Sequence, residues 1–79
     1  MDRHALVEWI RHNGSSFVDQ FLPVGALAEL ESVIRDCRHE VDKDAFLMFA
    51  SIRALLCKSG MTSCESEREA GQIMALLKT

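Results

Sequence analysis

The sequence is poor in proline and glycine and contains no tyrosine. Its 79 residues include one proline and four glycines, with 48% hydrophobic and 27% charged residues. This is the composition of a globular chain, and it excludes extensive disorder away from the ends. A chain of this length has room for one domain, which we assign to residues 1–79. Its core is small, so self-association is a common route to stability at this size.

Long apolar runs and paired cysteines are also missing. No stretch approaches the roughly 18 consecutive apolar residues that a membrane span requires. The amphipathic N-terminal segment lacks the apolar centre of a secretory signal. The three cysteines are an odd number and form no Cys-x-x-Cys pair. We therefore expect reduced thiols, a cytoplasmic location and no membrane association.

An excess of basic charge is absent as well. Nine Lys and Arg residues stand against twelve Asp and Glu residues, giving a formal net charge of −3, and the basic residues are scattered singly. A protein that binds DNA by itself usually carries a basic stripe, because phosphate contacts dominate the affinity. Any action on DNA is therefore expected to be indirect, through a partner protein.

The pattern indicates neither a metal site nor a catalytic site. Zinc ligands usually come in close pairs, whereas Cys37 and His39 are not so spaced and Cys57 lies far from Cys64. We interpret Cys37 and Cys57, which fall on apolar stripes, as small buried side chains. No glycine-rich loop or nucleophile elbow accompanies a Cys–His pair. We therefore predict no metal, no cofactor and no enzymatic activity.

Apolar residues recur at helical spacing along the chain. Asn13-Gly14-Ser15 has the composition of a helix end, Pro23 that of a break, and Asp42 that of an N-cap. Thr62-x-x-Glu65 fits a capping box. The predicted helices are Asp2–His12, a short segment capped by Ser15 or Ser16 and ended by Pro23, Val24–Arg38, Lys43–Lys58, and a last helix from about Thr62. The fold class is therefore all-α, a compact bundle of four to five short helices.

The Lys43–Lys58 helix is apolar on nearly every side. A helix of this kind is either fully enclosed or packs on two different partners. The other helices of so small a chain can hardly enclose it, so we expect a second chain to cover one face. The residues predicted to lie in that protein interface are Phe46, Leu47, Ala50, Ala54, Cys57 and Trp9.

Two observations support this choice of residues. Ala50, Ala54 and Cys57 are small and follow at i, i+4 and i+7, so they allow two helices to approach closely. The contact is expected to be two-fold, as in most homodimers, although the same pattern also fits a tight helix crossing within the monomer. Trp9 lies on a short helix, and tryptophan is favoured at interface hot spots. Ala54→Glu should then yield a folded protein that is monomeric or does not bind its partner.

The chain resembles the AriR/YcgZ family of biofilm-development regulators. The resemblance rests on Ala5-Leu6-x-x-Trp9-Ile10-Arg11-x-x-Gly14 and on Val41-Asp42-Lys43-Asp44 leading into Ala45–Leu56. A competing resemblance, to the Hha/YmoA nucleoid modulators, rests on Leu30-Glu31-x-Val33-Ile34 with Glu40, Phe49 and Ser51. Here the Ala-Asp-His-Arg run of that family is absent, and Ile52 to Leu55 read Ile-Arg-Ala-Leu.

Both resemblances imply a small helical regulator that acts through dimers or protein partners. We therefore expect a homodimeric adaptor that binds a transcriptional regulator or nucleoid protein and modulates stress, biofilm or virulence gene expression in bacteria. The alternative is an inhibitor of phage or plasmid type, or a secretion chaperone, that occludes one host protein.

Overall fold

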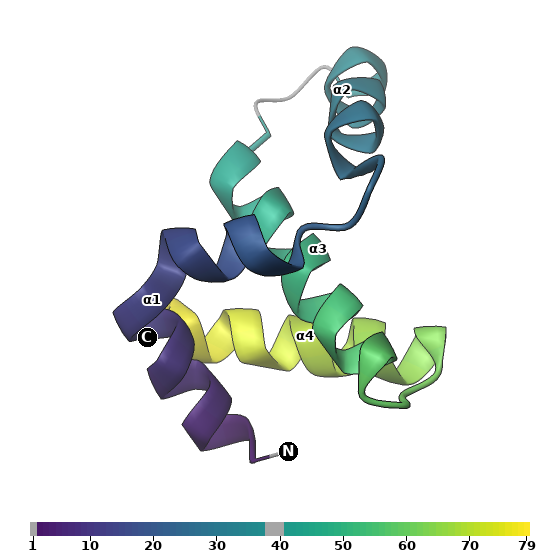
Figure 1. Cartoon of the computed structure of the whole chain (residues 1–79). Helices are drawn as coiled ribbons and strands as arrows, with labels where there is room; N and C mark the ends of the chain where they lie inside the picture. Colours follow the sequence, from purple (N-terminus) through teal and green to yellow (C-terminus); the bar gives the residue numbers. More distant parts are fainter. Residues whose placement is uncertain (1, 38–40) are drawn as a thin grey trace.

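The computed structural model describes residues 2–37 and 41–79, and this part of the chain is helical, as predicted. Its helices pack into a small bundle that measures 36 × 26 × 21 Å along its principal axes. Figure 1 shows α2 at the end of the bundle away from both termini. In chain order the helices are α1 (Arg3–Phe21), α2 (Ala26–Asp36), α3 (Lys43–Lys58) and α4 (Ser63–Leu77).

Helix α3 is the centre of the bundle, because α1, α2 and α4 all pack against it. Each residue from 45 to 56 is buried or half-buried, and none is exposed. The other helices therefore cover more of α3 than the sequence led us to expect, since three of them pack against it, and residues 45–49 and 53–55 remain half-buried. The fully enclosed core lies between α1, α3 and α4 and comprises Leu6, Val7, Ile10, Phe17, Ile52, Leu56, Ala70 and Ile73.

Helix α1 is one helix, whereas the sequence predicted two. The Asn13-Gly14-Ser15 signal does not end the helix but coincides with a bend in it, visible in Figure 1. The Asn13 side-chain amide donates a hydrogen bond to the Trp9 carbonyl oxygen at 3.0 Å. Side-chain bonds to the i−4 carbonyl and glycine–serine pairs are both recognised causes of helix bending. Continuation beyond the bend buries Phe17 completely, which outweighs the local stop signal.

The bounds of α3 are as predicted, because both ends carry explicit capping groups. The Asp42 carboxylate accepts a hydrogen bond from the Ala45 amide at 3.1 Å. At the other end Gly60 has a φ of 110°, its amide bonds to the Cys57 carbonyl, and the Met61 amide bonds to the Leu56 carbonyl. This pair of bonds is a Schellman motif, which needs a residue that tolerates the left-handed conformation.

The N-terminus of α4 is also as predicted. The Thr62 hydroxyl oxygen accepts a hydrogen bond from the Glu65 amide at 3.2 Å and donates one to the Glu65 carboxylate at 2.9 Å. The Thr62 hydroxyl is therefore hydrogen-bonded to both the backbone amide and the carboxylate of Glu65. A negative charge in this first turn is favoured by the helix dipole.

Helix α2 is shorter than predicted. It begins at Ala26 and ends at Asp36, so Val24 lies outside it, and Arg38 falls outside the described residues. Pro23 lies before the helix, and the N-cap residue is Gly25, which has a φ of 88°. Gly25 provides no side-chain cap, and among the described helices α2 packs against α3 alone. Fewer contacts therefore hold α2 than hold the other helices.

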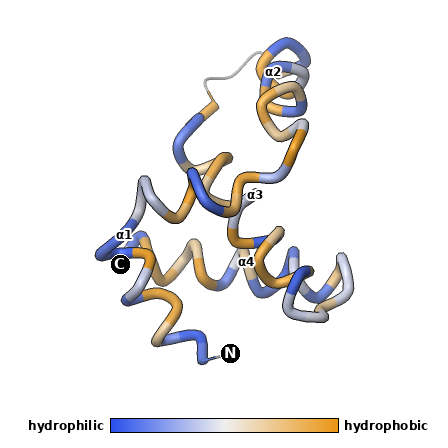
Figure 2. The backbone as a smooth tube through the Cα atoms, in the orientation of Figure 1, coloured by the Kyte–Doolittle hydropathy of each residue, from blue (hydrophilic) through white to orange (hydrophobic). Residues whose placement is uncertain are grey.

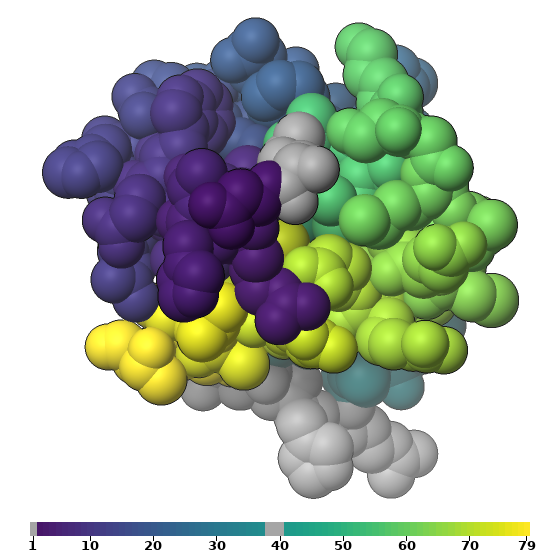
Figure 3. Space-filling model, turned by 90° about the horizontal axis from the view of Figure 1, so that it is seen from below, coloured from purple at the N-terminus to yellow at the C-terminus, as the bar shows by residue number. Residues whose placement is uncertain are grey.

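Two arginine side chains of α1 donate hydrogen bonds to residues of α4. The Arg3 guanidinium binds both carboxylate oxygens of Glu69, with Nη2 at 2.8 Å from Oε2. This hydrogen bond and the positive charge lower the pKa of Glu69, although partial desolvation acts in the opposite direction. The Arg11 guanidinium donates to the Leu76 carbonyl at 2.9 Å. Figure 3 shows the resulting contact, with the purple N-terminal part of α1 lying directly against the yellow-green surface of α4.

Candidate functional site

The six predicted interface residues lie on two helices and differ widely in exposure. Ala50 is only 4% exposed and is buried within the bundle, so it has almost no surface to offer another chain. Phe46, Leu47 and Ala54 are half-buried. Cys57 is exposed near the C-terminal end of α3, and Trp9 lies on α1 with 41% of its surface exposed.

The C-terminal part of the small-residue face packs within the protein. The Cys57 sulfur lies 3.0 Å from the Ser66 hydroxyl oxygen on α4, and the buried Ser66 hydroxyl is also within 3.0 Å of the Ser63 carbonyl. Cys57 therefore marks a helix crossing inside the monomer at this point, the alternative that the spacing had left open. The interpretation of Cys37 and Cys57 as buried side chains is wrong, since both are exposed.

The apolar side chains that the bundle leaves uncovered lie mainly at α2. Val24 is fully exposed, Leu27 is 58% exposed and Ile34 is 39% exposed. Leu27 and Ile34 are seven residues apart, so they lie on the same side of α2, two turns from each other. Figure 2 shows the hydrophobic residues of α2 and of the segment that leads into it, at the outer end of the bundle. We refer to Val24, Leu27 and Ile34 as the α2 face.

The sequence shows the apolar residues of this face, but helical periodicity does not indicate which of them pack against α3 and which stay exposed. In the sequence, one apolar stripe at helical spacing within the predicted Val24–Arg38 helix consists of Leu27, Leu30, Val33, Ile34 and Cys37. Only Leu30 is buried and Val33 half-buried, because α3 covers one edge of the stripe. The stripe is wider than the contact with α3, so the apolar side chains along its other edge remain exposed to solvent. Val24 stands between Pro23 and Gly25, where helix periodicity gives no information.

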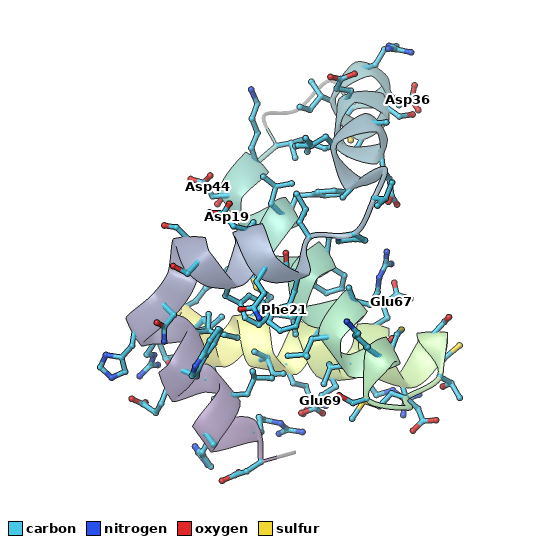
Figure 4. All side chains as sticks on the ribbon, viewed as in Figure 1. Asp19, Phe21, Asp36, Asp44, Glu67 and Glu69 are labelled. Carbon is cyan, nitrogen blue, oxygen red and sulfur yellow. The ribbon has the colours of Figure 1, made fainter. Side chains whose placement is uncertain are left out.

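A groove opens between the second half of α1 and the start of α3. Its volume is about 390 Å³. The half-buried side chains of Val18, Leu47 and Met48 supply apolar lining, and Asp19 and Asp44 contribute carboxylates from the two helices. Figure 4 shows these two acidic side chains beside each other. Together with Gly14 and Ser15, these residues define the α1–α3 groove. Of the predicted interface residues, it contains Leu47.

Two further kinds of site were sought in the described residues. No group of three or more His, Cys, Asp and Glu side chains there is arranged to hold a metal ion. His39, one of the zinc candidates, lies outside this part of the chain. None of the described helices combines the length and the apolar character needed to cross a membrane.

Comparison with known proteins returned no match to a protein-family model, to a curated protein or to a solved structure. The structural part of the functional argument therefore rests on the α2 face and the α1–α3 groove.

Proposed function

We propose that this protein is a small regulatory adaptor that self-associates and binds a protein partner, and that the α2 face is the centre of its self-association. The observation that carries the proposal is the position of α2. This helix packs against α3 alone among the described helices, and it leaves Val24, Leu27 and Ile34 open to solvent. Burial of large apolar side chains contributes about 1.5–3 kcal/mol each, so a second chain that covered them would gain substantially.

A second copy of this chain is the occupant that we favour for the α2 face. Closed two-fold dimers are the commonest assemblies, and in them one patch meets its own copy. A domain of 79 residues also has a small core of its own, which self-association would enlarge. This proposal replaces α3 by α2 as the contact, because three helices of the bundle already pack against α3 and none of its residues from 45 to 56 is exposed.

The test is the molar mass in solution across a range of protein concentrations. Leu27→Glu should yield a folded monomer, because a carboxylate cannot be buried cheaply in an apolar contact. Ala28→Glu is the matched control, since Ala28 is exposed on another side of α2 and the variant adds the same charge to the same turn. A wild-type protein that stays monomeric at millimolar concentration, or a Leu27→Glu variant that still assembles, would refute the role of the α2 face.

The regulatory part of the proposal is supported by the two family resemblances. They suggest a transcriptional regulator or nucleoid protein of bacteria as the partner. Binding can be measured with purified candidate regulators, comparing wild-type protein with the monomeric Leu27→Glu variant. An adaptor that must be dimeric loses binding in that variant, whereas an inhibitor that occludes its target as a monomer retains it.

A further inference from the structure

The α1–α3 groove combines an apolar lining with two like charges that the protein itself does not neutralise. Among the described residues, the ion pairs are those of Arg3 with Glu69 and of Glu8 with Arg11, and neither involves Asp19 or Asp44. Both aspartates are exposed, and both line the groove. Lys43 is adjacent to Asp44 in the sequence but does not line the groove. The negative potential here therefore favours a positively charged guest.

Gly14 provides a second observation at the same place. It lies inside α1, and a Cβ atom added to it would meet no atom within 4 Å. Glycine inside a helix costs about 1 kcal/mol relative to alanine, and the surrounding bundle offers no steric reason to require it. Gly14 is one of the residues that line the groove, so another chain can approach the backbone of α1 closely at this point.

We propose that the α1–α3 groove is a second binding site, separate from the α2 face, that receives a short segment of a partner protein bearing lysine or arginine beside apolar side chains. The aliphatic stem of such a residue would lie on Val18, Leu47 and Met48, and its charged end would reach the carboxylates of Asp19 and Asp44. Long basic side chains combine these two properties, because their methylene stems cover apolar surface while their ends stay hydrated. This inference goes beyond the proposed self-association and does not depend on it.

A synthetic helical peptide with leucines on one face and lysines beside them is a suitable probe. Its binding to the full-length protein can be followed by NMR titration of the backbone amides, which locates the contact as well as measuring affinity. The proposal predicts saturable shifts centred on the α1–α3 groove. The same peptide with glutamate in place of lysine should bind far more weakly. Binding should also weaken as salt is added, since exposed charges are screened.

Two matched double variants test whether the groove carboxylates are responsible. Asp19→Asn with Asp44→Asn should weaken peptide binding about fivefold, as expected for the loss of two exposed ion pairs. Asp36→Asn with Glu67→Gln changes the net charge equally but alters exposed residues of α2 and α4 (Figure 4), and it should leave the affinity nearly unchanged. Equal weakening by the two double variants would mean general attraction to an acidic protein and would overturn the proposal.

Gly14→Leu tests the groove by filling it. The space around Gly14 is open, and leucine is a better helix former than glycine, so this variant should fold at least as stably as the wild type. It should nevertheless reduce peptide affinity by tenfold or more. Unchanged affinity in a folded Gly14→Leu protein, or amide shifts centred elsewhere, would overturn the proposal.

The molar mass of Gly14→Leu separates the two proposals. If filling the groove abolishes self-association, then the occupant is a second copy of this chain, and the assignment to a basic partner segment is wrong. If Gly14→Leu assembles like the wild type and only peptide binding is lost, the groove and the α2 face act independently. A failure of Leu27→Glu to affect assembly would refute the α2 face without touching the groove.

Discussion

The indole ring of Trp9 stands edge-on against the ring of Phe17, with ring centroids 5.4 Å apart and an interplanar angle of 71°. Eight residues of straight helix would separate the two Cα positions by about 12 Å along the axis. We attribute the contact to the bend in α1 between these residues. Trp9 therefore packs against a side chain that is fully buried in the core, although its place on a short predicted helix had suggested an interface residue.

The Trp9–Phe17 contact should contribute to stability in the monomer. Trp9→Ala should lower the free energy of unfolding by about 1–2 kcal/mol, because it removes an aromatic pair and part of the cover over Phe17. Trp9→Leu keeps apolar cover and should cost less. Urea denaturation followed by circular dichroism measures both. If Trp9→Ala proves as stable as the wild type, Trp9 has no packing role and is free to serve an interface alone.

Two glycines should respond in opposite directions to the same substitution. Gly71 lies inside α4 with open space around it, whereas Gly60 has a φ of 110°. Gly71→Ala should raise the free energy of unfolding by about 1 kcal/mol, because alanine favours the helix. Gly60→Ala should lower it by about 1–2 kcal/mol, because an L-residue is strained in the left-handed conformation. Thermal unfolding of the two variants provides the comparison, and a stabilising Gly60→Ala would contradict the helix-end geometry.

The Arg3–Glu69 ion pair should give stability a defined dependence on pH. The hydrogen bond from Arg3 holds the pKa of Glu69 below its ordinary value in the folded protein. The contribution of the pair is therefore complete above the unfolded glutamate pKa of about 4.3 and is lost as the pH falls through the lower folded value. NMR titration of the Glu69 carboxyl should show this low pKa.

The variants isolate the cause of this shift. Arg3→Gln should move the pKa of Glu69 up towards its ordinary value, and Arg11→Gln should leave it unchanged, since Arg11 binds elsewhere on α4. An identical Glu69 pKa in wild-type and Arg3→Gln protein would show that the two side chains are not paired in solution.

Arg11 should stabilise the C-terminal end of α4, which has no basic residue in its own last turn. Its guanidinium reaches the Leu76 carbonyl from another helix, where a cation is favoured by the helix dipole. Arg11→Gln should cost about 0.5–1 kcal/mol and speed amide hydrogen exchange in the last turn of α4. Arg68→Gln, an exposed position in the same helix, serves as the control and should leave that exchange unaltered.

Helix α2 should open before the rest of the bundle. It is held by one neighbouring helix, and its start lacks a side-chain cap. Its amides should therefore exchange with solvent faster than those of α3, which is packed on three sides. Leu30→Ala should increase this difference, because Leu30 is the large buried side chain of α2. Equal protection of α2 and α3 in the monomer would contradict this expectation.

The helix ends that could be predicted from the sequence are those set by capping residues. Asp42, Gly60 and Thr62 define the ends of α3 and the start of α4 through contacts with residues near them in the chain. Local sequence contains all the information for such contacts. The same reasoning from local sequence wrongly predicted a helix end at Gly14. Whether α1 ends or bends there depends on the burial of Phe17 against distant parts of the chain.

The candidate surfaces could not be predicted from the sequence, because helical periodicity does not indicate which helices pack against one another. The wheel identified α3 as apolar on every side but could not indicate which helices surround it. Ala50 consequently seemed available, although the bundle buries it. The α1–α3 groove brings Asp19 beside Asp44 only after α1 continues past Gly14, so the prediction of a helix end at Gly14 concealed it.

The two arginine contacts between α1 and α4 join residues that are 66 and 65 positions apart in the chain. Helices α3 and α4, by contrast, are separated only by residues 59–62. Closing a short connection costs less chain entropy than closing a long one, so we expect the α3–α4 hairpin to assemble first and α1 to dock last. Until that final step, the surface of α4 that packs against α1 in the finished bundle is open to water, and a chaperone or a neighbouring nascent chain would meet it there.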